Sequence, residues 1–84
     1  MTKLEVTYFV TLRVNGESEM AKSFEEAQLN EAMALYGNTI VNLSQDVSED
    51  PKGVEIELAV MTRRIDSNGA VTAEKTSVMS KLEL

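Results

Sequence analysis

The sequence predicts an α+β protein with a mostly antiparallel β-sheet of four to five strands and one α-helix packed on one face, in the order ββαβββ. Three observations predict this class. Long segments alternate apolar and polar residues, turn-forming residues at 15–16 and 67–69 separate such segments, and a single stretch has helical periodicity. With 84 residues, 43% of them hydrophobic, we expect residues 1–84 to form a single domain around one core.

The N-terminal segment has the clearest strand pattern. Alternation places one apolar set on the same face: Leu4, Val6, Tyr8, Val10, Leu12 and Val14. Asn15-Gly16 is a strong hairpin signal, and residues 17–22 can return as a second strand. One extra residue in the returning strand, as in a G1 bulge, would move Met20 onto the apolar face, so we favour a bulged hairpin.

The segment after this hairpin predicts the only helix. Ser23 and Glu26 have the spacing of a capping box, and Gly37-Asn38 predicts the C-terminal end of the helix. Glu25 and Glu26 in the first turn suit the positive end of the helix dipole. The apolar residues between these signals fall on one broad side: Phe24, Leu29, Ala32, Met33, Leu35 and Tyr36.

The second half of the chain predicts strands only. Residues 39–47 are expected to form one strand, and residues 48–53 a polar turn that contains the only proline. Alternation from residue 54 onward predicts a further strand, and residues 67–69 predict a second hairpin loop. This loop would pair Leu58 with Val78 and Val54 with Leu82, which extends the last strand to the C-terminus.

Charge is unevenly distributed along the chain. Residues 17–57 contain ten acids and two bases, a net charge of −8, whereas the remainder has four acids and six bases, a net charge of +2. Direct binding to nucleic acid is disfavoured, because phosphate backbones require clustered Lys and Arg. The only basic pair, Arg63-Arg64, would point to opposite faces of a strand. We expect a basic protein partner or a self-complementary assembly; alternatively, the net charge of −6 only maintains solubility.

The residue types argue against an enzyme. The chain has no His and no Cys, so it lacks the commonest general base, the thiolate nucleophile and the commonest metal ligands. Asp46, Ser48, Asp50 and Glu57 partly imitate a calcium loop, but Pro51 occupies the position at which that loop requires Gly. We therefore expect no catalytic residue, no cofactor and no metal site.

The termini and hydropathy predict a cytoplasmic protein. The N-terminal residues lack the apolar core of a signal peptide, and no apolar run has the length of a transmembrane helix. In size, acidity and lack of catalytic residues, the chain resembles the small proteins with which bacteriophages block host defence or nucleic-acid enzymes. This resemblance is one of general character and extends to no motif, so it assigns no role to any residue.

Two functional hypotheses follow. In the first, an acidic surface occupies a basic groove of a nucleic-acid-binding protein and inhibits it; its expected residues are Glu17, Glu19, Glu25, Glu26, Glu49 and Asp50. In the second, the protein is a structural or assembly subunit that self-associates through its edge strands or its open sheet face. The residues expected to carry partner contacts on that open face are Phe9, Met61, Met79 and Arg63.

Overall fold

The computed structural model describes residues 2–45 and 53–83, and it confirms the α+β class. All neighbouring strands pair antiparallel in one four-stranded sheet of order β2-β1-β3-β4. In chain order the elements are β1 (Lys3–Val14), β2 (Glu17–Glu25), a 3-10 turn (Glu26–Gln28), α1 (Leu29–Gln45), β3 (Val54–Ile65) and β4 (Val71–Glu83).

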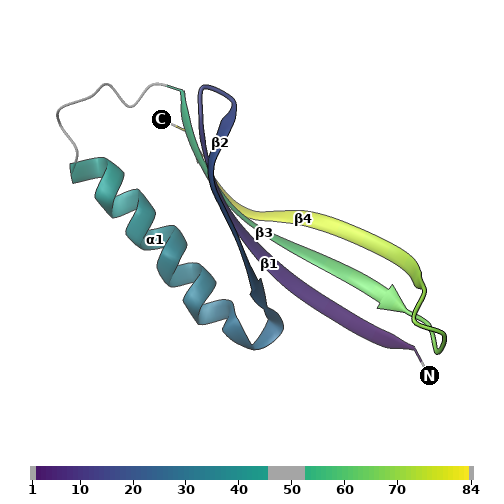
Figure 1. Ribbon diagram of the computed structural model, residues 1–84. Helices are drawn as coiled ribbons and strands as arrows, with labels where there is room; N and C mark the ends of the chain where they lie inside the picture. The colour runs from purple at the N-terminus through teal and green to yellow at the C-terminus, as the bar shows by residue number, and fades with distance from the viewer. Residues whose placement is uncertain (1, 46–52, 84) are drawn as a thin grey trace.

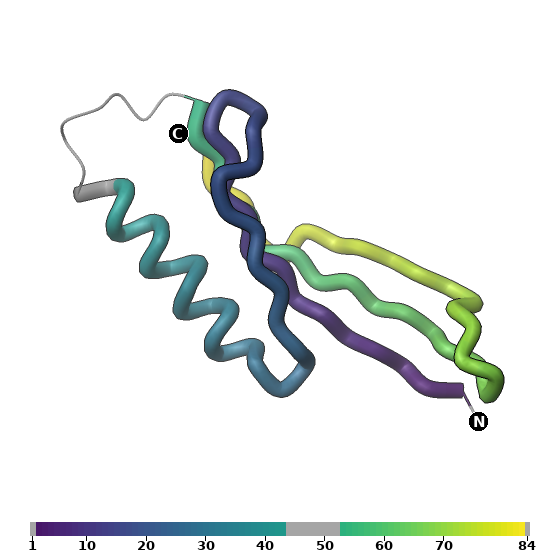
Figure 2. Tube along the Cα trace, in the orientation of Figure 1, coloured from purple at the N-terminus to yellow at the C-terminus, as the bar shows by residue number. Residues whose placement is uncertain are grey.

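The molecule is elongated, with extents of 53 × 24 × 16 Å. Helix α1 lies along one face of the sheet, and the sheet continues beyond it (Figure 1). Strand β2 ends opposite Thr7, so the sheet beyond this point has three strands. We call this three-stranded part the arm, which comprises residues 3–6, 62–65 and 71–75. The N-terminus lies at the tip of the arm, beside the turn between β3 and β4 (Figure 2).

The core lies between α1 and the part of the sheet that the helix covers. Its buried side chains come from β1, β2, α1 and β3: Val10, Phe24, Ala32 and Leu58. Partly buried neighbours complete it: Tyr8, Met20, Leu35 and Tyr36. Apolar alternation therefore directs the even-numbered residues of β1 and β3 toward the helix, as the sequence predicts.

The first hairpin confirms the expected bulge. Asn15 and Gly16 have φ values of 53° and 84°, which a two-residue hairpin turn with the twist of the strands requires. Leu12 pairs with Met20, whereas Arg13 pairs with Ser18, so Glu19 is the extra residue. The bulge lies inside β2 rather than at the glycine, and it brings Met20 against the core.

The predicted start of the helix is wrong by a few residues. Ser23 does not cap it, because β2 continues to Glu25 and positions Phe24 in the core. The capping box instead joins Glu25 and Gln28, and the backbone N–H of Glu25 donates a 3.0 Å hydrogen bond to Gln28 Oε1. The packing of Phe24 in the sheet therefore decides where β2 ends and the helical turn begins.

The predicted end of the helix is also wrong. Helix α1 runs through Gly37 and Asn38 to Gln45, so the strand expected over residues 39–47 is helical over 39–45. Thr39 Oγ1 donates to the Leu35 carbonyl at 2.7 Å, and Thr39 and Leu43 are half-buried on the sheet side. Packing against the sheet thus overrides the glycine signal. Residues 46–47 and the polar turn at 48–52 lie outside the described residues.

The second hairpin has a different register from the predicted one. Leu58 pairs with Ser80 rather than Val78, and Ile56 rather than Val54 pairs with Leu82. Two extra residues in β4, Thr72 and Met79, produce the shift. Because β4 is exposed along almost its whole length, no continuous buried face fixes its register, and apolar alternation gives the wrong pairing.

Candidate functional site

The open face of the sheet, opposite α1, has an apolar row at its centre. Phe9 pairs with Ala59, and Ala59 pairs with Val78, so three strands contribute one residue each. Ala59 is buried beneath its neighbours, whereas Val78 is 55% exposed. Met61 is half-buried in the same strand, and Met79 is exposed as the extra residue of β4. The structure thus brings Phe9 and Met61 onto one face, as predicted, and adds Val78 to it.

One end of this row has a cluster of paired charges. Arg13 Nη1 donates hydrogen bonds to Glu55 Oε1 at 2.8 Å and to Glu57 Oε2 at 2.9 Å. Lys81 Nζ lies 3.4 Å from Glu55 Oε1 and 3.2 Å from Glu83 Oε1. The hydrogen bond with Glu57 raises the pKa of Arg13, and the hydrogen bond with Glu83 raises the pKa of Lys81. These carboxylates therefore lie beside cations that compensate their charge.

The other end of the row has a second pair, in which Arg63 Nε lies 3.3 Å from Glu74 Oε2. This nitrogen is shielded from solvent, but the contact does not meet hydrogen-bond geometry. The contact is therefore electrostatic. Arg63, one of the residues expected on this face, thus has an acid beside it in the neighbouring strand.

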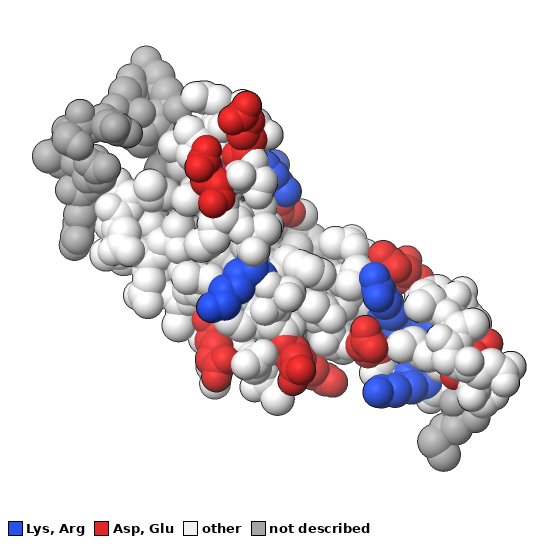
Figure 3. Space-filling model, in the orientation of Figure 1, with Lys and Arg blue, Asp and Glu red and all other residues white. Residues whose placement is uncertain are grey.

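The acids of β2 form a different group. We define the β2 acidic edge as the exposed residues Glu17, Glu19, Glu25 and Glu26. Glu17 and Glu19 lie at one end of β2 and Glu25 and Glu26 at the other, with Lys22 between them. Figure 3 shows separate groups of acidic side chains on this side of the molecule, with basic side chains between them. Lys22 Nζ lies 5.5 Å from the centre of the Phe24 ring. Among the described residues, no ion pair includes a member of this edge. Glu49 and Asp50 lie outside the described residues.

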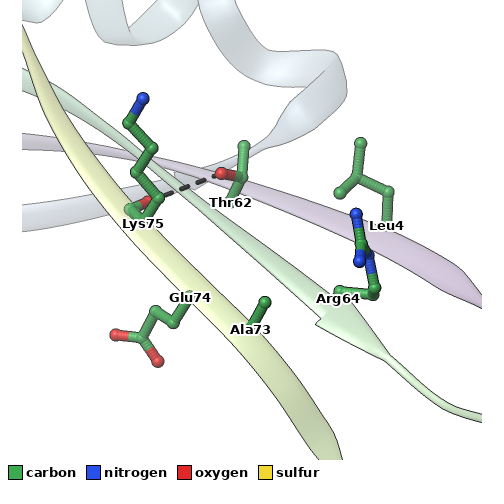
Figure 4. Close-up of a pocket in the computed structure, with 6 residues that line it drawn as sticks. All are labelled: Leu4, Thr62, Arg64, Ala73, Glu74 and Lys75. Atoms are coloured by element: carbon green, nitrogen blue, oxygen red, sulfur yellow. Dashed lines mark hydrogen bonds between the residues drawn. The ribbon is translucent and has the colours of Figure 1, made fainter.

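A shallow pocket of about 200 Å³ lies on the arm and was not expected from the sequence. Figure 4 shows its lining residues: Leu4, Thr62, Arg64, Ala73, Glu74 and Lys75. Lys75 pairs with Thr62, and Thr62 and Arg64 are two residues apart in β3, so all three side chains are on the same face of the sheet. This is the face on which α1 lies. This placement depends on the β3–β4 register. Because apolar alternation predicts the wrong register, the sequence does not predict the pocket.

Comparison of the chain with protein-family models, curated proteins and solved structures gives no match. Within residues 2–45 and 53–83, no group of three or more acidic side chains has an arrangement that could hold a metal ion. The imitation of a calcium loop at residues 46–50 lies outside the described residues. Among the described helices, none combines the length and apolar character needed to cross a membrane. Functional inference therefore depends on the surfaces described above.

Proposed function

We propose that the chain is a non-enzymatic binding protein whose β2 acidic edge docks on a basic surface of a nucleic-acid-binding protein and inhibits it by occupancy. One contrast carries this proposal. The acids Glu55, Glu57 and Glu74 have cationic neighbours, whereas the four exposed acids of the β2 acidic edge have no ion pair within the described chain. Uncompensated carboxylates attract a basic partner and accelerate its association.

The spacing of these acids favours docking on a protein surface over close mimicry of DNA. A strand rises about 3.3 Å per residue, so the nine residues of β2 cover roughly 30 Å. Glu26 directly follows β2, so the four carboxylates extend over roughly 33 Å and give about one charge per 8 Å, whereas duplex DNA has one per ~1.7 Å. The edge therefore resembles a sparse acidic surface, and the charge of the partner should form two patches that match the two ends of β2.

The test compares three baits in a nuclease-treated bacterial lysate. The first is the wild-type chain, and the second has Glu17→Gln, Glu19→Gln and Glu26→Gln, which spares the capping residue Glu25. The third is a matched control with Glu74→Gln and Glu83→Gln, whose carboxylates have cationic neighbours. Retained proteins are identified at low and at high salt, and each is then assayed for nucleic-acid binding with and without the wild-type chain.

The expected result is a basic nucleic-acid-binding protein that the wild type and the control retain at low salt but not at high salt. The β2 variant should lose it, because neutral amides remove the attraction. The wild-type chain should also reduce the nucleic-acid binding of that protein. Equal retention by the β2 variant, or unchanged nucleic-acid binding in the presence of the chain, would refute the proposal.

A further inference from the structure

Strand β4 is a long and exposed edge of the sheet. It has 13 residues, and of these only Leu82 is not fully on the surface. Helix α1 approaches it at Tyr36, whose hydroxyl shares a 2.9 Å hydrogen bond with that of Ser80. The strand contains no proline, which would prevent further main-chain pairing. An edge of this kind is a template for another strand, and its main-chain groups supply the hydrogen bonds.

We propose that β4 pairs antiparallel with β4 of a second copy of this chain, around a two-fold axis at Ser77. Ser77 is the midpoint of Val71–Glu83, so this register gives the longest overlap of the two strands. The axis lies perpendicular to the sheet, which keeps the helices of both copies on the same side. Two four-stranded sheets thereby become one continuous sheet, with the two β2 strands at its outer edges.

The side chains of β4 are complementary in this register. Met79 is the extra residue of its strand, so Glu74 and Lys81 occupy the same face of the sheet. With Met79 extra in each copy, Glu74 of one copy lies opposite Lys81 of the other, and the symmetry repeats this pair. Ala73 lies opposite Leu82 in the same way. Opposite charges and apolar pairs directly across two strands stabilise a sheet.

Strand β2, the other edge, disfavours the equivalent pairing. Overlap of Glu17–Glu25 with its own copy places Glu17 opposite Glu25 at both ends, and like charges that face each other destabilise a sheet. Self-association is therefore directed to β4. This inference does not depend on the proposed function, because the two use opposite edges and the dimer would present two β2 acidic edges.

The absence of cysteine in the chain allows a direct test of the axis. Ser77→Cys places one thiol opposite its own copy, where Cβ atoms are about 4.5–5.5 Å apart, close to the span of a disulfide. The matched control is Ser23→Cys, because Ser23 is likewise an exposed serine, in β2. Under mild oxidation we expect the first variant to form a covalent dimer at a concentration at which the second remains largely monomeric. Equal rates of cross-linking would overturn the proposal.

Sedimentation velocity over a concentration series tests the contacts. We expect a wild-type dimer that persists at high salt, because main-chain hydrogen bonds stabilise it. A protein bound to the β2 acidic edge should instead dissociate at high salt. Lys81→Glu should weaken the dimer at least roughly ten-fold, and addition of Glu74→Lys should restore part of this loss. Lys22→Glu, the matched control in β2, should leave dimerisation unchanged. A wild type that stays monomeric at every concentration, or equal effects of the two Lys→Glu variants, would overturn the proposal.

Discussion

The two edges of the sheet differ in what holds them and in what they leave exposed. β2 is short and anchored, because Phe24 is buried beneath α1 and Met20 packs against the same core. β4 is longer and has no buried side chain. Charge is distributed the other way: acids on β4 form ion pairs, and the acids of the β2 acidic edge form none among the described residues. Anchoring by the helix leaves β2 free to present charge, whereas β4 is held mainly by its pairing with β3.

The largest expected effect comes from removing the anchor of β2. Phe24 is 7% exposed, so we expect Phe24→Ala to lower the free energy of unfolding by about 3–5 kcal/mol. Val78→Ala in β4 should cost less than about 0.5 kcal/mol, because this residue is already 55% exposed. Urea denaturation at low protein concentration, where self-association contributes least, measures both values. Similar losses in the two variants would show that the edges are equally anchored and would remove the contrast.

Those parts of the fold that local patterns determine could be predicted from the sequence. β1 and β3 pair without a register shift, and apolar residues at alternate positions over 4–14 and 54–60 predict their faces. Asn15-Gly16 determines the first hairpin. The end of α1 could not be predicted, because Thr39 and Leu43 are half-buried on the sheet side and this packing overrides Gly37. Propensity describes a segment in isolation, and the helix ends where its tertiary contacts allow.

For the candidate site, the sequence identifies the charged residues but not the ion pairs that they form. Summed along the chain, Glu55 and Glu57 belong to the segment of net charge −8, yet both accept hydrogen bonds from Arg13, over 40 residues away. Only the sheet register reveals which acids are compensated. For β4 the sequence gives little register information, since a strand that is exposed on both faces has no apolar set to align. The sparse pattern of uncompensated charge is therefore a property of the fold.

An intermediate loss of stability is expected from Gly→Ala substitutions next to the two hairpin turns that lead into β2 and β4. Gly53 adjoins the β1–β2 turn, where its carbonyl accepts a 2.8 Å hydrogen bond from the Asn15 N–H, and Gly69 belongs to the β3–β4 turn. Both have positive φ, 80° and 83°, so Ala costs about 1–2 kcal/mol at either position. At Gly53 a Cβ would also clash with Asn15 Oδ1, whereas the space at Gly69 is open. Thermal and urea unfolding should show that Gly53→Ala is the more destabilising by about 1 kcal/mol. An equal or larger loss for Gly69→Ala would show that the contact with Asn15 does not restrict the residue at position 53.

The smallest effect tests the contrast in charge itself. Arg13→Met removes the cation shared by Glu55 and Glu57. Glu57 is then left without an ion pair among the described residues, like the acids of the β2 acidic edge, whereas Lys81 still lies 3.4 Å from Glu55. Because the pair is partly exposed, we expect a loss of only about 1 kcal/mol at low salt, and less at about 0.5 M NaCl, where the charges are screened. Lys22→Met is the matched control, since Lys22 has no ion pair among the described residues, and its effect should be within about 0.5 kcal/mol of zero. Urea unfolding of the wild type and of both variants at the two salt concentrations measures these changes in the free energy of unfolding. If the two substitutions have equal effects at low salt, Arg13 does not compensate these carboxylates in solution, and the acids of β3 do not differ from those of the β2 acidic edge.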